Sequence, residues 1–510
     1  MKVVFRVDAN AQIGSGHLVR CATLAGALRA RGAETRFLCR GLPDAWQAWL
    51  AGQALAWHEL GPARTPSQPA AGDPPHAAWL ATGWDQDARD CAGALGDERA
   101  DWLVVDHYAL DARWERSLRP HATRLLAIDD LADRDHEVDA LLDLNLHEHA
   151  ASRYAARVAA STRLLLGPRH ALLRPAFAEA RRGLRPRPDT VRRVLVFFGG
   201  FDARNTTGTV LGALDAMRQD GLHGFAVDAV IGAAHPARDA LQAFCAERPG
   251  WICHVQTERM AELMAAADLA VGAGGGATWE RCALGLPTVA VAQADNQVEQ
   301  LATAARAGVL CAPQLRDDSA AAWRVPIEAL WLDPLRRAHL ADAAHALVDG
   351  QGAERVAQFM ARPALTVRPA TASDSGFVHA GRNAEAVRRV SRSHAPIAAD
   401  AHQRWFDAAL ADPCRRLLIG LLGEQSVGVL RWDLDTDGVG AEVSLYLAPG
   451  HAGQGLGPEL LAAGEAWLRR ERPGPCALRA EVLAGNVASL HLFEQAGYTV
   501  RSQHFEKALP

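Results

Sequence analysis

The chain has 510 residues, of which 49% are hydrophobic and 22% charged, and its formal net charge is −5. This length predicts several domains, and the composition is that of globular proteins rather than disordered ones. Nucleic-acid binding usually needs a concentrated basic face, which the sequence does not show. Nine scattered cysteines predict neither a disulfide framework nor a metal site.

The N-terminus and the apolar runs bear on location. Residues 3–8 include two charges and make a poor signal peptide. No apolar run reaches about 18 residues, the length that a membrane-spanning helix needs. We therefore expect a cytoplasmic protein without a membrane partner.

The first third of the chain alternates short apolar runs with amphipathic stretches. Residues 18–31 carry apolar side chains at helical spacing. Four apolar runs predict buried strands: 3–7, 36–39, 102–105 and 125–128. Strands that alternate with helices predict βαβ units and a parallel sheet.

A Pro-rich, charged stretch at 183–193 predicts a linker before a second series of the same kind. Four further runs predict strands: 194–198, 227–231, 269–271 and 288–292. Two such halves predict two doubly wound lobes, residues 1–182 and 183–362, with a cleft between them.

The pattern changes near residue 362 to that of a mixed α/β domain, residues 363–510. A Gly-rich turn there precedes a predicted helix at 458–469. Five runs predict strands: 417–422, 426–432, 441–447, 477–482 and 498–502.

The run Gly14-Ser15-Gly16-His17 follows a predicted strand and opens a predicted helix. Glycines let a ligand approach the backbone, and a helix N-terminus supplies free amides and a positive dipole end. A histidine there has its charged form disfavoured and can act as a base. The alternative is that His17 only caps the helix.

Three consecutive glycines, Gly274, Gly275 and Gly276, again join a predicted strand to a predicted helix. Their exposed amides suit a diphosphate. Glu280 lies about one turn into the helix, where a carboxylate can accept hydrogen bonds from ribose hydroxyls. The alternative is a tight turn with a solvent-facing glutamate.

Together, motifs over about residues 1–350 resemble the UDP-sugar hydrolase family of pseudaminic acid biosynthesis. The matching runs are Arg6-Val7-Asp8-Ala9, Gly14-Ser15-Gly16-His17, Val105-Asp106-His107-Tyr108, Ile128-Asp129-Asp130-Leu131-Ala132-Asp133-Arg134, Gly167-Pro168-Arg169-His170, Phe198-Gly199-Gly200, Gly272-Ala273-Gly274-Gly275, Trp279-Glu280-Arg281-Cys282, Gly285-Leu286-Pro287 and Ala294-Asp295-Asn296-Gln297. That family has the two-lobed GT-B fold, two Rossmann-like lobes, and is similar to the MurG glycosyltransferase.

The resemblance implies release of UDP from UDP-2,4-diacetamido-2,4,6-trideoxy-β-L-altropyranose by water. His17 would be the general base and Tyr108 would help to place the water; inversion at C1 is expected. The family often has Ser where Gly276 stands. The residues that would bind the UDP-sugar are Gly14, Gly16, Arg20, Gly274, Gly275, Gly276, Thr278, Glu280, Asn296 and Gln297.

Two carboxylate-rich runs are weak metal candidates, and no metal is expected. Asp129-Asp130-x-x-Asp133 contains no histidine, so helix capping and structural hydrogen bonds explain it better. Asp433-x-Asp435-x-Asp437-Gly438 lacks the glutamate of a calcium loop, which favours a polar hairpin turn.

In the last domain, a predicted strand at 441–447 leads into a loop containing Gly453, Gly455 and Gly457, whose amides would point at a pyrophosphate. This loop and the later run 486–498 resemble the GNAT acetyltransferase family, whose cosubstrate is acetyl-CoA. By this resemblance Leu445, Tyr446 and Leu447 would splay from the neighbouring strand and pair with the pantetheine arm. Asn486 would contact the cofactor further along.

Two positions depart from the family pattern. Ala452 replaces the usual Arg or Gln at the start of the loop, and Phe493 replaces a tyrosine that often protonates the leaving thiolate. Water or another residue, Tyr446 among the candidates, would take that role. The runs Leu365-x-x-Arg368, Arg382-Asn383 and His402-x-x-Trp405-Phe406 are similar to the acetyltransferase of the same pathway; a capped amphipathic helix explains His402 and Trp405 equally well.

The leading interpretation is a bifunctional α/β enzyme, a GT-B hydrolase followed by a GNAT N-acetyltransferase. It would acetylate the 4-amino group of a UDP-linked 2,4-diamino-2,4,6-trideoxy sugar and then remove UDP. One alternative is a glycosyltransferase with an unidentified acceptor. Another is a hydrolase whose GNAT domain only senses acetyl-CoA, which Phe493 favours.

Overall fold

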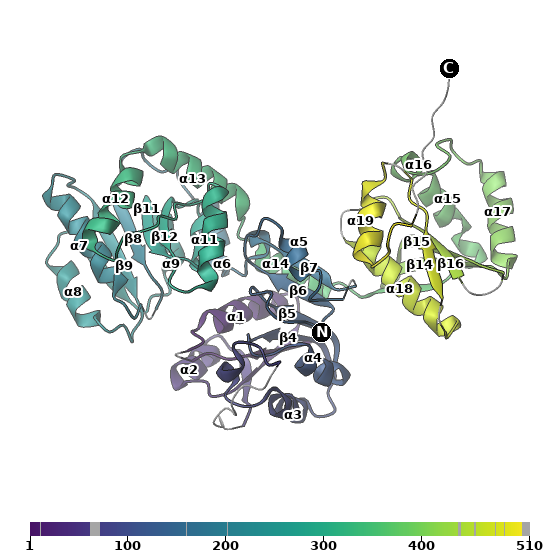
Figure 1. Cartoon of the computed structure of the whole chain (residues 1–510), viewed down its shortest axis with the longest axis horizontal. Helices are drawn as coiled ribbons and strands as arrows, with labels where there is room; N and C mark the ends of the chain where they lie inside the picture. The colour runs from purple at the N-terminus through teal and green to yellow at the C-terminus, as the bar shows by residue number, and fades with distance from the viewer. Residues whose placement is uncertain are drawn as a thin grey trace, which may run out of the picture. The chain divides into compact units, whose positions relative to one another are not determined.

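A computed structural model describes residues 1–501 apart from positions 11, 62–71, 160, 201, 437–439, 453–454, 475 and 484, and apart from the side chain of residue 495. The chain forms two compact units, Met1–Ala361 and Arg362–Pro510. Figure 1 shows that each unit combines β-sheet with covering helices. In the part of the chain that the structure describes, no helix is long and apolar enough to cross a membrane.

The first lobe of the first unit is built on a parallel sheet of seven strands in the order β3-β2-β1-β4-β5-β6-β7. The strands are β1 (Lys2–Val7), β2 (Glu34–Cys39), β3 (Ala56–Glu59), β4 (Ala100–Asp106), β5 (Ala122–Ile128), β6 (Ala140–Asp143) and β7 (Arg163–Leu166). The connecting helices are α1 (Gly16–Arg29), α2 (Asp44–Gly52), η1 (Ala77–Leu80), α3 (Trp84–Leu95), α4 (Ala112–Leu118), η2 (Arg119–His121), α5 (Ala150–Tyr154) and η3 (Pro168–His170).

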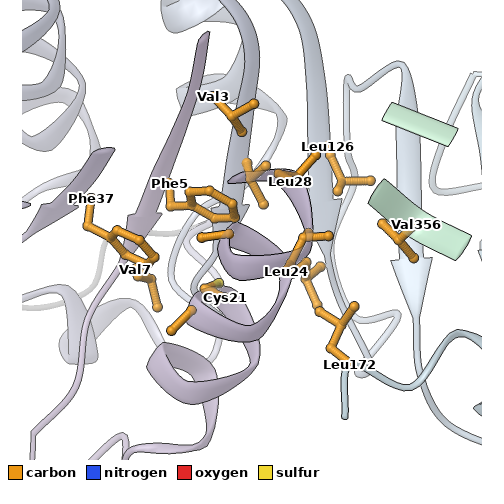
Figure 2. Close-up of a cluster of buried hydrophobic side chains, with 14 of the residues drawn as sticks. Val3, Phe5, Val7, Cys21, Leu24, Leu28, Phe37, Leu126, Leu172 and Val356 are labelled. Atoms are coloured by element: carbon orange, nitrogen blue, oxygen red, sulfur yellow. The ribbon is translucent and has the colours of Figure 1, made fainter. Parts of the chain in front are cut away.

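The core of this lobe forms where α1 packs on the sheet, as Figure 2 shows. Phe5 and Phe37 on neighbouring strands stack with ring centroids 4.9 Å apart. Leu24 and Leu28 of α1 lie one turn apart and are fully buried against them. The apolar face of α1 thus fixes the helix, and with it the loop that precedes it, over the carboxyl end of β1.

The second lobe has a parallel sheet of five strands in the order β10-β9-β8-β11-β12. The strands are β8 (Arg193–Phe197), β9 (Ala226–Ile231), β10 (Trp251–Val255), β11 (Leu269–Ala273) and β12 (Thr288–Val291). The helices that follow them are α7 (Thr206–Gln219), α8 (Arg238–Ala246), α9 (Met260–Ala266), α10 (Ala277–Ala283), α11 (Asn296–Arg306), α12 (Ala320–Trp331) and α13 (Pro334–Leu347).

Two helices pack on one lobe although their position in the sequence would place them in the other. Helix α6 (Pro175–Arg182) precedes the expected linker, yet its Phe177 is buried in the core of the second lobe. Helix α14 (Gly352–Ala361) follows the second lobe, yet Val356 and Met360 are buried against α1 in the core of the first. The two helices therefore lie on the other side of the predicted boundaries at residues 182 and 362.

The segment predicted as a linker is fixed to the second lobe by several hydrogen bonds, of which those of Arg187 are the most numerous. The Arg187 guanidinium donates to the carbonyls of Gly285 at 3.1 Å and Leu284 at 2.8 Å, and also to that of Ala267. Burial lowers the pKa of Arg187 to about 10, and these carbonyls replace the water that its charge has lost.

The second unit has a five-stranded sheet in the order β13-β14-β15-β16-β17. The strands are β13 (Leu365–Pro369), β14 (Arg415–Leu422), β15 (Gln425–Leu434), β16 (Gly440–Leu447) and β17 (Ala477–Ala480). The helices are η4 (Ala372–Asp374), α15 (Ser375–Asn383), α16 (Glu385–Arg389), α17 (Ala399–Ala411), α18 (Leu456–Glu471) and α19 (Val487–Gln495). All neighbours are antiparallel except β16 and β17, which are parallel.

The structure differs from the sequence-based expectation in several strands. The sequence did not predict β3, β6, β7, β10 and β13. The strand expected at 498–502 is wrong for its described residues, since 498–501 form no strand. Tyr498 instead packs its ring against Phe493, with centroids 5.1 Å apart, and donates a hydrogen bond to Glu465 at 3.1 Å.

Candidate active site

A histidine–aspartate pair lies where α1 begins and β4 ends. His17 Nδ1 and Asp106 Oδ1 are 2.6 Å apart, and both side chains are at least nine-tenths buried. Although burial opposes its charge, the Arg20 guanidinium and the hydrogen bonds from Arg20 and His17 keep the pKa of Asp106 well below its usual range. An ionised carboxylate only accepts hydrogen bonds, so Nδ1 carries the proton and Nε2 keeps its lone pair. The arrangement orients an imidazole for proton uptake at Nε2.

Arg20, one turn further along α1, ties this pair to a second carboxylate. Its guanidinium donates to Asp106 Oδ1 at 2.6 Å and Oδ2 at 2.7 Å, and to Asp130 at 3.3 Å. Asp130 in turn accepts a 2.7 Å hydrogen bond from the Tyr108 hydroxyl. Arg20 therefore bridges two aspartates, and its role in substrate binding stays a prediction.

Tyr108 completes the group. Its ring meets the His17 ring edge-on at 4.7 Å, and burial together with the Asp130 charge raises the pKa of the phenol well above 10. The phenol is therefore neutral, donates its proton to Asp130 and leaves its oxygen lone pairs free to accept from a water.

A buried ion network beneath the site fixes the turn that carries these residues. Arg6 donates to Asp8 and to Asp87, and all three side chains are almost completely buried. His107, between Asp106 and Tyr108, places Nε2 3.3 Å from Asp8 and accepts from the Ala109 amide at Nδ1. The ends of β1 and β4 are thus held in register by charge as well as by the sheet ladder.

The run of three glycines joins β11 to α10, as expected. A Cβ at Gly274 would lie 3.1 Å from Gln297 Oε1, and Gly275 has a φ of +82°, a conformation that favours glycine. A Cβ at Gly276 would meet nothing within 4 Å. Gln297 also accepts from the Gln293 amide at 3.0 Å, so this side chain and the glycine turn form one structure.

Glu280 is half-buried, and within the described residues its carboxylate makes no hydrogen bond or ion pair. Burial raises its pKa, although Arg174 and Arg281 oppose this. The carboxylate oxygens are therefore available to a ligand. Thr278 is buried and accepts from Arg281 at 3.3 Å, which is a structural contact.

The remaining predicted residues of the first unit lie at helix starts. Gly14 has a φ of +78° in the turn before α1, and Gly16 is the first residue of α1. Asn296 is the first residue of α11 and is exposed. Their roles toward a substrate stay predictions.

Asp129, the first of the clustered carboxylates, makes structural contacts. It accepts from the Ala132 amide at 2.9 Å and from Arg134 at 2.8 Å. Asp433 pairs with Arg415 and Arg431, and Asp435 pairs with Arg479; residues 437 and 438 of that run lie outside the described residues. Among the described residues, no group of three or more His, Cys, Asp or Glu side chains could hold a metal ion.

In the second unit, the pairing of β16 with β17 ends early. The register runs from Gly440 to Val443, opposite Ala477 to Ala480, while β16 continues to Leu447 paired with β15 on its other side. Leu445, Tyr446 and Leu447 thus lie beyond the ladder on the β17 side. An edge of this kind offers backbone groups to an extended ligand.

The turn after β16 leads into α18. Gly453 lies outside the described residues; Gly455 has a φ of +71° and directly precedes α18. A Cβ at Gly457 would lie 2.7 Å from Leu492 of α19, so glycine here allows the two helices to approach. Asn486 caps α19 by accepting from the Ser489 amide at 3.2 Å.

The side chains considered for proton transfer are engaged elsewhere. The Tyr446 hydroxyl donates to the Val378 carbonyl at 2.9 Å, and burial raises its pKa. Phe493 is buried in the core of this unit. His402 is also buried and contacts the Ser375 carbonyl at 3.0 Å, as expected of a packed helix.

Sequence reasoning did not single out Asp106 and Asp130 as site residues. Asp106 ends β4, which lies next to β1 in the sheet, and Asp130 lies just beyond the carboxyl end of β5, the next strand along. Ligands of doubly wound sheets bind at such ends. The sequence signal that could have identified Asp106 and Asp130 was therefore an acidic residue at the end of an apolar run.

These observations define the class of the molecule. The sheet orders and the motif spacing confirm the predicted fold, two Rossmann-like lobes of the GT-B type followed by a GNAT domain. Residues 384–498 match the model of the acetyltransferase (GNAT) family.

Comparison with individual proteins is consistent with this class. The spore coat polysaccharide biosynthesis protein SpsG of Bacillus subtilis (strain 168) is 31% identical over 206 residues, 39% of this chain and 58% of that protein. The chain thus covers less than two thirds of this relative's length.

Solved structures show the fold alone, because their identities are low. The kitacinnamycin glycosyltransferase has a TM-score of 0.50 at 17% identity, over 70% of this chain and 98% of that chain. MurG of Acinetobacter baumannii gives 0.48 at 14% identity, over 71% and 99%. The aminoglycoside acetyltransferase AAC(6')-Ib with coenzyme A gives 0.25 at 18% identity, over 27% and 85%.

Proposed function

We propose that the first unit hydrolyses a UDP-sugar at C1, with UDP-2,4-diacetamido-2,4,6-trideoxy-β-L-altropyranose as its substrate. The observation that carries this proposal is the 2.6 Å contact between His17 and Asp106, which leaves His17 Nε2 as a base beside Tyr108. The name of the SpsG relative, a polysaccharide biosynthesis protein, supports a role in sugar metabolism.

The reaction needs few groups. His17 Nε2 takes a proton from a water that the Tyr108 oxygen helps to position. The water oxygen attacks C1, and the bond from C1 to the UDP oxygen breaks with its electron pair leaving on the diphosphate. Asp106 stabilises the imidazolium that forms. Attack from the face opposite UDP predicts inversion at C1.

The second lobe would hold the leaving group. Backbone amides in the turn of Gly274, Gly275 and Gly276 would donate to the diphosphate, and the unpaired carboxylate of Glu280 would accept from the ribose hydroxyls. UDP is a good leaving group, so a strong general acid is not required. Preorganised donors of this kind contribute on the order of 3 kcal/mol each to a transition state.

We further propose that the second unit acetylates the 4-amino group of the precursor with acetyl-CoA. The unpaired edge of β16 beyond Val443 supports this, since it offers backbone groups to the pantetheine arm. The amine attacks the thioester carbonyl and gives up one proton as the amide forms, the C–S bond breaks, and the CoA thiolate takes up a proton. Because Phe493 has no hydroxyl and that of Tyr446 is engaged, water would supply this proton.

The first experiment measures UDP release from this substrate without any acceptor. Wild type should release UDP, His17→Ala should lose at least about a hundredfold in rate, and His58→Ala, an exposed histidine of the same lobe, should match wild type. Failure of folded wild type to release UDP would reject this substrate. Release that appears only when a sugar or lipid acceptor is added would establish the glycosyltransferase alternative.

The sensor alternative rests on Phe493, which is buried and has no hydroxyl. Formation of CoA from acetyl-CoA and the 4-amino precursor by the full chain would establish catalysis. Binding of acetyl-CoA without CoA formation would establish a sensor.

A further inference from the structure

A cluster of aromatic rings extends from His17, the candidate base, to a segment that has no role in the proposed reaction. The Tyr108 ring, which contacts His17, lies 5.4 Å from the His76 ring and 5.9 Å from the Trp79 ring. His76 and Trp79 meet edge-on at 4.6 Å. Four rings are therefore contiguous, and the catalytic group stands at one end of them.

The segment that carries His76 and Trp79 is anchored in the lobe. Trp79 lies in the short helix η1, whose last residue, Leu80, is buried in a core cluster. Asp73, just before this helix, accepts a 3.0 Å hydrogen bond from Arg113 of α4. The two rings are thus presented by a fixed backbone, as a preformed binding surface requires.

Both side chains keep capacity for a ligand. His76 and Trp79 are half-buried, and the indole N–H of Trp79 has no hydrogen-bond partner among the described residues. His76 Nδ1 is 4.0 Å from Asp133, too far for a hydrogen bond, so aromatic contacts hold this ring. The half-buried Trp79 indole thus packs on Tyr108, whose ring contacts the candidate base His17.

We propose that Trp79, with His76 and Tyr108, forms the platform on which the sugar of the nucleotide substrate lies, and that it selects sugars with apolar edges. The inference rests on the proposed hydrolysis. A 2,4-diacetamido-2,4,6-trideoxy sugar presents a C6 methyl and two acetyl methyls, which pack on aromatic faces. The free indole N–H suits an acetamido carbonyl. A hexose that bears hydroxyls at these positions loses this contact and leaves its hydroxyls unpaired.

Binding to the full chain tests the platform apart from turnover. In the His17→Ala background, the affinity for UDP-2,4-diacetamido-2,4,6-trideoxy-β-L-altropyranose and for UDP alone is measured by calorimetry, with and without Trp79→Ala. We expect Trp79→Ala to weaken sugar-nucleotide binding about tenfold and to leave UDP binding unchanged. Trp46→Ala removes a half-buried tryptophan of α2, away from the rings, and should change neither. Equal affinities with and without Trp79 overturn the platform.

Measurements of turnover distinguish failure of the platform proposal from failure of the proposed hydrolysis. If wild type releases UDP and Trp79→Ala has the same KM and the same preference over UDP-N-acetylglucosamine, hydrolysis stands and the platform is overturned. If wild type releases no UDP while the calorimetric loss is seen, the platform stands and hydrolysis fails. Trp79→Phe keeps a flat ring and should recover most of the loss; if Trp79→Ala does not fold, Trp79→Phe against Trp79→Leu makes the same comparison.

Discussion

Asp106 holds two side chains in place at once, the imidazole of His17 and the guanidinium of Arg20. Asp106→Asn keeps the shape but can present its amide N–H to His17 Nδ1, which reverses the tautomer and removes the lone pair from Nε2. We expect the kcat for UDP release to fall by about two to four orders of magnitude. The affinity for UDP should stay within about twofold, because its expected site is on the other lobe.

Steady-state UDP release and calorimetric UDP titration measure the two quantities. Asp101→Asn is the matched control, since Asp101 is exposed at the opposite end of the same strand, β4. An unchanged kcat for Asp106→Asn would remove the orienting role from this carboxylate.

His136 gives the first unit a stability that depends on pH. It lies 2.7 Å from Glu115 and 3.8 Å from Asp129 with almost no exposure. Burial opposes its charge, but the two carboxylates outweigh burial and raise its pKa to about 9. The folded state therefore holds this proton more tightly than the unfolded chain, whose histidines titrate near 6.5. This contribution, at most about 3 kcal/mol, is complete below pH 6.5 and is lost as pH rises through 9.

Urea unfolding of wild type and His136→Gln between pH 5 and pH 10 checks this sign. The free energy of unfolding of wild type should fall relative to that of the variant across this window, and the two should be parallel below about pH 6. Curves that stay parallel throughout would show that folding does not raise the pKa of His136.

At the scale of elements, the sequence predicted all of the long, buried strands, and every strand that it missed is short or lies at a sheet edge. β4 and β5 are seven residues each and almost wholly buried. β3 and β10 lie at sheet edges, and both contain a histidine, so neither shows a continuous apolar run. β6 and β7 have only four residues each, which leaves little periodicity to indicate a strand.

The same limit applies to the site. The Gly-rich turns and His17 are local patterns, and sequence reasoning identified them. The partners of His17 are not local, because Asp106 is 89 residues away and only the order of the strands brings the two together. The packing of α14 on α1 is another such long-range contact, which periodicity within one helix does not specify.

The stability of the first lobe depends on helix α14, whose residues follow the second lobe in the sequence. Met360 is fully buried against the first lobe, and its carbonyl accepts from the Trp102 indole at 2.9 Å. Met360→Ala leaves a cavity and should cost about 2–5 kcal/mol. The exposed Gln358 of the same helix offers the control Gln358→Ala, which should cost less than about 0.5 kcal/mol. Thermal unfolding compares them; equal melting temperatures would show that α14 is dispensable.

At the scale of the whole molecule, one chain carries two compact units, each with one of the two proposed reactions. The order of acetylation and hydrolysis can therefore be measured in a single protein. The 4-amino precursor is the UDP-linked sugar that is acetylated only at N2. If the sugar platform prefers two acetyl groups, the second unit must act on this precursor before the first unit does. We expect little UDP release without acetyl-CoA, and release after a lag when acetyl-CoA is added. CoA should appear first, because the acetylated intermediate must accumulate before hydrolysis becomes fast.

His17→Ala separates the two activities within the full chain. It should form CoA at the wild-type rate and release no UDP, since the substitution lies in the unit Met1–Ala361 and acetylation is assigned to Arg362–Pro510. Loss of CoA formation in this variant would mean that the two units are coupled rather than merely joined. Immediate UDP release from the 4-amino precursor by wild type without acetyl-CoA would mean that hydrolysis does not wait for acetylation, and the units would then act on their substrates in either order.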